Sequence, residues 1–112
     1  MKQEDSSALD HKNSPYDSLT GLYHLDTFKT NMKQYLKEQD SESHLALLYT
    51  DIAHFERINN LYGRSLADSL LLELSRAISQ IDFGLRLYCR SVADHFVMLI
   101  KFEEKKRLDH AL

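Results

Sequence analysis

Two aspartates carry side chains of the right type, at the right places, for metal chemistry. Asp51 closes an apolar run over 44–52 (HLALLYTDI) whose two alternating faces are both apolar, which is typical of a strand covered on both sides. Asp94 lies in the short link between apolar runs over 85–91 and 95–102. Mg²⁺ commonly takes one or two protein carboxylates and completes its shell with water and nucleotide phosphates. The pair therefore suits phosphoryl or nucleotidyl transfer, although aspartates are also common in turns for conformational reasons alone.

The apolar spacing predicts the elements that must position these aspartates. In chain order they are a helix over about 24–38, a strand over 44–52, a helix over about 65–81, and strands over 85–91 and 95–102. Because the last two runs are separated by only a short link, they are expected to form a β-hairpin. If the hairpin packs beside the first strand, the two aspartates converge at one edge of the sheet.

The remaining segments are less regular. Residues 53–64 are expected to form a short helical turn and then a loop closed by Gly63. The polar segment 1–16 is expected to be a flexible leader or linker, with a domain over 17–112. The last ten residues are expected to start another helix.

Composition narrows the function classes. A chain of 112 residues with a net charge of −3 offers no basic surface for a phosphate backbone, so no nucleic-acid partner is expected. No apolar run reaches the length of a membrane span, and the N-terminus lacks the apolar core of a signal peptide. Cys89 is the single cysteine, so no internal disulfide can form, and it alternates with Leu85 and Leu87 like a core residue. These features indicate a cytoplasmic protein.

Four separate blocks resemble the GGDEF (diguanylate cyclase) family in order and spacing. The family patterns D-x-L-T-G-L, D-I-D-x-F-K-x-I-N-D-x-x-G-H, G-D and R-x-G-G-D-E-F align with Asp17–Leu22, Asp51–Arg64, Ala67-Asp68 and Arg90–Phe96. The resemblance implies an α/β (α+β) fold of the nucleotidyl-cyclase type, with a largely antiparallel central sheet flanked by helices. It covers about 17–108, so the domain is expected to be partial and incomplete at its C-terminal end.

The resemblance also implies a nucleotide site. Asp51, the backbone carbonyl of Ile52 and Asp94 would bind metal, with Asp94 also catalytic, and Asn59, Asp68 and Phe55 would bind nucleotide. An aspartate can accept hydrogen bonds from the N1–H and N2–H edge of guanine. Mg²⁺ is the cofactor expected when nucleotide is bound.

The signature itself departs from the family pattern. It is Val92, Ala93, Asp94, His95 and Phe96 in place of G-G-D-E-F. The two glycines would allow unusual backbone φ angles and close approach of a ligand, and a β-branched valine suits neither. His95 replaces an acid with a neutral or positive group, Ala53 removes an aspartate, and Glu56 stands where a lysine is usual.

Three functions stay open. The first is a degenerate, catalytically impaired GGDEF domain that acts as a GTP-binding or regulatory module in cyclic di-GMP signalling, beside a sensor or effector domain. The second is a working diguanylate cyclase that condenses two GTP across a homodimer, and the third is a ligand-free scaffold. In the family a later strand lies beside strand 44–52, so its absence would leave an open edge that favours self-association.

Overall fold

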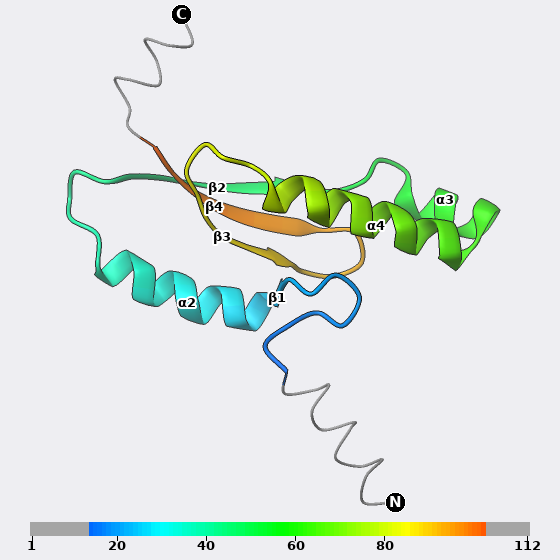
Figure 1. The fold of residues 1–112 in the computed structure, drawn as a ribbon, viewed down its shortest axis with the longest axis horizontal. Helices are drawn as coiled ribbons and strands as arrows, with labels where there is room; N and C mark the ends of the chain where they lie inside the picture. The colour runs from blue at the N-terminus through cyan, green and yellow to red at the C-terminus, as the bar shows by residue number, and fades with distance from the viewer. Residues whose placement is uncertain (1–13, 103–112) are drawn as a thin grey trace, which may run out of the picture.

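Residues 14–102 of the computed structural model form one sheet with helices on both faces (Figure 1). The elements in chain order are β1 (Tyr23–His24), α2 (Leu25–Lys37), β2 (His44–Thr50), α3 (Phe55–Tyr62), α4 (Arg64–Ser79), β3 (Leu85–Arg90) and β4 (Phe96–Phe102). Residues 1–13 and 103–112, which hold most of the expected leader and the expected last helix, lie outside the described residues. Tyr16, also assigned to the leader, bridges to Tyr23 and stacks on its ring at 5.5 Å.

The sheet has the strand order β1-β3-β4-β2. Strands β2 and β3 both run antiparallel to β4, and the short β1 runs parallel to β3. The predicted hairpin is therefore confirmed, as is the largely antiparallel sheet. Residues 96–100 of β4 are all buried because this strand has a neighbour on each side and helices above and below it.

Each face of the sheet has its own buried cluster. On one face α2 contributes Phe28, which packs with Cys89, Val97 and Leu99. On the other face α4 contributes Leu71 and Ile78, which pack with Phe96 and Met98. Alternate residues of β4 serve opposite clusters, as the two-residue period of a strand requires. Because β4 contributes side chains to both clusters, it links the two halves of the core. Burial of each large apolar side chain in these clusters contributes roughly 1.5–3 kcal/mol.

A bulge in β3 changes which side chains share a face. The register of β3 on β4 shifts between Leu85 and Leu87, so Leu85 packs on the α4 side while Leu87 and Cys89 pack on the α2 side. Simple alternation had predicted all three on one face, which is wrong at Leu85. Cys89 is fully buried, and that burial raises the pKa of its thiol to about 11. It is a core residue, as expected.

The segment after β2 is more helical than the sequence indicated. In place of a short turn and a loop, the chain forms α3 and enters α4 directly after Gly63. Phe55 and Ile58, three residues apart, give α3 a half-buried side, and α3 packs against α4. Gly63 has a φ of 91°, which lets the chain turn between the two helices.

Strand β2 lies at the edge of the sheet and is less covered than predicted. Helix α2 packs over β1 and β3. On that face of β2, Leu45 packs against the α2-side cluster, but Tyr49 is 75% exposed and Leu47 is 43% exposed. Leu48 on the opposite face is 42% exposed. Within residues 14–102 the expected cover on both faces is therefore incomplete, and no strand there pairs with the outer edge of β2.

We expect the 112-residue chain to self-associate through β2. Replacing Leu47→Lys and Tyr49→Lys together should weaken self-association roughly tenfold or more, because like charges would face each other across paired edges. Light scattering over a concentration series measures this, with Tyr62→Lys as the control, since Tyr62 is 68% exposed on α3. A wild-type chain that stays monomeric at high concentration would contradict the expectation.

Candidate functional site

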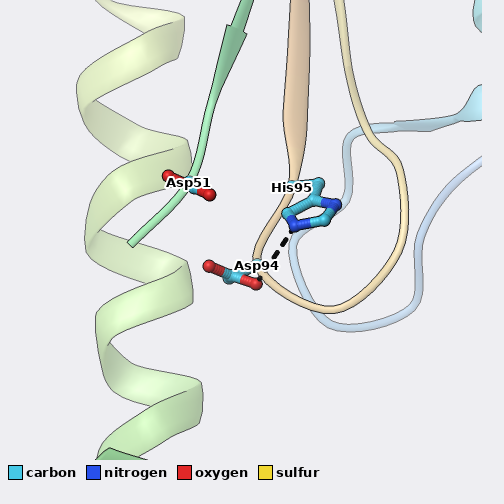
Figure 2. A group of neighbouring side chains, drawn as sticks. All are labelled: Asp51, Asp94 and His95. Carbon is cyan, nitrogen blue, oxygen red and sulfur yellow. Dashed lines mark ion pairs between the residues drawn. The ribbon is translucent and has the colours of Figure 1, made fainter. Parts of the chain in front are cut away.

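Asp51, Asp94 and His95 meet at one end of the sheet (Figure 2). One ligand atom of each lies within 4.8 Å of the others. The meeting follows from strand pairing, because Thr50 at the end of β2 is the register partner of Phe96 at the start of β4. The structure thus brings the two aspartates together, as the sequence predicts, and adds His95 beside them.

Asp94 is held in place by the backbone. It is 8% exposed, and the N–H of Ile52 donates to its Oδ2 at 2.9 Å. Its other oxygen, Oδ1, lies 3.7 Å from Nε2 of His95. Asp51 is exposed, so the site combines one fixed carboxylate with one that can adjust to a ligand.

Ile52 contributes to both the site and the fold. Its carbonyl, the expected metal ligand, accepts a hydrogen bond from the N–H of Phe55 at 3.1 Å. A carbonyl oxygen has two lone pairs, so one remains for a cation. Phe55, expected at the nucleotide, is half-buried and packs with the cluster on the α4 side.

The two expected base-binding residues lie on the helix pair. Asn59 is on α3 and Asp68 is on α4, and both side chains are half-buried. Within residues 14–102 neither side chain has a hydrogen-bond or ion-pair partner. Asp68 does not belong to the cluster of Asp51, Asp94 and His95. The polar side-chain atoms of Asn59 and Asp68 therefore make no hydrogen bond or ion pair that supports the described part of the fold.

In the turn of the β3–β4 hairpin, only one of the two positions that hold glycine in the family has a backbone conformation that favours glycine. Ala93 has a φ of 53°, in the left-handed region, whereas Val92 does not have a positive φ. The turn is closed by the N–H of Ser91 donating to the carbonyl of His95 at 2.7 Å, and by the N–H of His95 donating to that of Val92 at 2.9 Å. A non-glycine residue in this region costs roughly 1–2 kcal/mol. Of the two replaced glycines, the second is therefore the one that the backbone needs.

Arg90 supports this turn, a role that the sequence reasoning missed. Its Nη1 lies 3.2 and 3.1 Å from the two carboxylate oxygens of Asp17, and its Nε donates to the carbonyl of Ala93 at 2.9 Å. Oδ2 of Asp17 also accepts from the N–H and the hydroxyl of Thr20, each at 2.8 Å. The sequence shows only that two motif blocks far apart carry opposite charges, which does not by itself identify Asp17 as the partner of Arg90.

Burial and hydrogen bonding shift the pKa of the Asp17 carboxyl in opposite directions. Burial would raise the pKa of its carboxyl, but the hydrogen bonds from Thr20 and the neighbouring Arg90 guanidinium lower it by more, so the pKa lies below its ordinary value of 3.8. Asp17 is therefore ionised at neutral pH and pairs with Arg90, whose side chain is only 17% exposed.

The fold and the paired aspartates define a nucleotidyl-cyclase-type domain. The family model described as "Diguanylate cyclase, GGDEF domain" matches residues 14–111. This chain belongs to the GGDEF family. None of the helices in residues 14–102 has the length and hydropathy of a membrane span.

Several known proteins are similar to this chain. The uncharacterized protein YhcK of Bacillus subtilis is 36% identical over 87 residues, which are 76% of this chain and 24% of that protein. Diguanylate cyclase DgcN of Escherichia coli is 29% identical over 86 residues, 76% of this chain and 21% of that protein. The crystal structure of the GGDEF domain of DgcB from Caulobacter crescentus, in complex with c-di-GMP, has a TM-score of 0.72 at 20% identity and covers 86% of this chain and 57% of that one. The chain thus spans about a quarter or less of these two curated relatives.

We expect Asp17→Asn to lower the free energy of unfolding at pH 7 by about 1–3 kcal/mol, since it leaves Arg90 without its charged partner. A carboxyl whose pKa is lowered by folding stabilises the fold above its unfolded pKa of 3.8, and this contribution is lost as the pH falls through the folded pKa. The difference between wild type and variant should therefore shrink in acid. Urea unfolding at several pH values measures this.

The matched control is Asp82→Asn, because Asp82 is exposed and has no hydrogen-bond or ion-pair partner within residues 14–102. It should unfold like the wild type at each pH. An Asp17→Asn variant as stable as the wild type at pH 7 would show that the Asp17–Arg90 contact does not stabilise the fold.

Proposed function

We propose that this chain is a catalytically impaired GGDEF domain that binds GTP and acts as a regulatory or interaction module in cyclic di-GMP signalling. One observation carries the proposal. Asp51 and Asp94 still converge, but Asp94 sits on a hairpin turn that has lost both glycines and the second acid of the signature.

The donor set fits Mg²⁺. Two carboxylates, from Asp51 and Asp94, and the carbonyl of Ile52 are hard oxygen ligands, and Mg²⁺ completes its shell with waters and nucleotide phosphates. Bound there, Mg²⁺ would neutralise the negative charge of the phosphates. Asn59 and Asp68 would contact the guanine, because their half-buried polar atoms have no partner within residues 14–102.

The turn argues against turnover. Formation of a phosphodiester requires the attacking 3′-hydroxyl to be held in line with the α-phosphate, and small misplacements cost large factors in rate. Val92 is 65% exposed, so its side chain occupies space beside the turn that a glycine would leave free. His95 supplies no negative charge where the family has an acid, and Glu56 adds one where the family has a lysine.

The relatives support a role in cyclic di-GMP signalling. DgcN is named as a diguanylate cyclase, and the DgcB domain was crystallised with c-di-GMP. The matched region is 21% of DgcN, so most of that protein lies outside the matched domain. By analogy, a sensor or effector domain is the expected partner of this one.

A working cyclase is the rival function, and the convergence of Asp51 and Asp94 favours it. It would need the turn to accept GTP despite Val92 and Ala93. A ligand-free scaffold is the remaining rival, and it differs from both in that no nucleotide binds.

The test is a calorimetric titration of GTP into the protein, with Mg²⁺ and with EDTA. We expect binding that depends on Mg²⁺ and that weakens about tenfold, or about 1.4 kcal/mol, in Asn59→Ala and in Asp68→Asn, because each loses contacts to the base. Asp82→Asn is the control and should bind like the wild type. Absence of GTP binding in the wild type would favour the scaffold. Binding that is unchanged in both site variants would show that Asn59 and Asp68 do not contact the base.

A further inference from the structure

His95 brings a ligand of another chemical class to the Asp51–Asp94 pair. Its Nε2 lies 3.7 Å from Oδ1 of Asp94, and all three residues have a ligand atom within one 4.8 Å group (Figure 2). The family has an acid at this position, so the chain exchanges a carboxylate oxygen for an imidazole nitrogen.

The spacing is close to what one metal ion requires. Zn²⁺ binds histidine nitrogen at about 2.0–2.1 Å and carboxylate oxygen at about 2.0–2.2 Å, so two tetrahedral ligands lie about 3.4 Å apart. The pair of His95 and Asp94 is already near this separation at 3.7 Å. The Asp51 carboxylate, at 4.8 Å or less from the other two ligand atoms, is exposed and can move inward.

The surroundings of the three side chains also suit an ion. The N–H of Ile52 fixes the Asp94 carboxylate through Oδ2 and leaves Oδ1 facing His95, which is the kind of support that orients metal ligands. The His95 side chain is 54% exposed, so its ring can rotate toward an ion. A hollow of about 230 Å³, lined by Tyr49, Thr50, Asp51 and His95, gives access from solvent and room for bound water.

We propose that Asp51, Asp94 and His95 form a three-ligand site that prefers a first-row transition-metal ion such as Zn²⁺ to Mg²⁺. Imidazole suits Zn²⁺, and Zn²⁺ binds mixed nitrogen and oxygen sites more strongly than Mn²⁺ or Fe²⁺. Mg²⁺ is instead usually held by one or two carboxylates together with waters and phosphates. The replaced acid thus changes which metal the site selects.

The inference rests on the proposed function only in sharing Asp51 and Asp94, and it needs no nucleotide. Its rival is an ion pair in which His95 contacts Asp94 and binds nothing. A metal titration without nucleotide separates the two. It also separates this inference from the proposed function, whose failure would appear as absence of GTP binding.

The experiment titrates Zn²⁺ alone, and Mg²⁺ alone, into the full chain and follows heat by calorimetry. We expect the wild type to bind Zn²⁺ more tightly than Mg²⁺, and His95→Ala to weaken Zn²⁺ binding about tenfold or more while Mg²⁺ binding stays within about twofold. His95→Glu should reverse the preference by restoring an oxygen ligand. Co²⁺ gives a second readout, because its visible absorption should report nitrogen ligation in the wild type and change in His95→Ala.

The control is His54→Asn. His54 is also exposed but has a φ of 58°, a conformation that asparagine tolerates, and it lies outside the three-residue group. This variant should bind Zn²⁺ like the wild type. Equal Zn²⁺ affinity in the wild type and His95→Ala, each folded by circular dichroism, would overturn the proposal, as would a wild type that prefers Mg²⁺.

Discussion

The contact of Arg90 with Asp17 and Ala93 is the constraint on which the site depends. Its guanidinium binds the Asp17 carboxylate on one side and the Ala93 carbonyl on the other. Asp17 is itself fixed by two hydrogen bonds from Thr20. A charge-assisted pair of this kind, with both side chains mostly buried, is more rigid and stronger than a surface ion pair. The turn that contains Asp17 and Thr20, which precedes β1, and the turn of the β3–β4 hairpin therefore act as one unit.

That unit sets the position of Asp94, one residue after Ala93. The carboxylate of Asp94 then accepts a hydrogen bond from the N–H of Ile52, and this bond connects the hairpin to the segment that follows β2. Asp51 precedes Ile52, so the two carboxylates approach each other as a consequence of backbone hydrogen bonding. Two acids held together in this way favour a bound cation, because the cation offsets their mutual repulsion. Relative to the family pattern, the chain thus retains Asp17 and Arg90, which position the carboxylates, whereas the hairpin turn that would face a nucleotide carries different residues.

Much of the fold follows from local patterns. The helical spacing in α2 and α4 and the apolar runs of β2, β3 and β4 predict these elements to within about two residues, and the short link predicts the hairpin. The convergence of Asp51 and Asp94 follows once the hairpin and β2 share a sheet. These features depend on residues near one another in sequence, or on the pairing of long apolar strands.

Features that depend on distant partners could not be read in the same way. The apolar character of β2 predicts burial, but whether a helix reaches it depends on where α2 packs, and α2 lies over β1 and β3. The bulge in β3 places Leu85 on the opposite face from Leu87, and strand alternation carries no sign of it. The Asp17–Arg90 pair joins residues 73 positions apart, and opposite charges alone do not select one partner among many. That His95 is adjacent to Asp94 is evident from the sequence, but the approach of its ring to the aspartate pair depends on the geometry of the turn.

We propose that the chain keeps the carboxylate pair but has lost the turnover of a diguanylate cyclase. The most direct measurement is incubation of the purified protein with GTP and Mg²⁺, followed by chromatography with mass detection of the nucleotides. We expect GTP to be recovered unchanged. Formation of cyclic di-GMP by the wild type, abolished in Asp51→Ala, would contradict this expectation and identify a working cyclase.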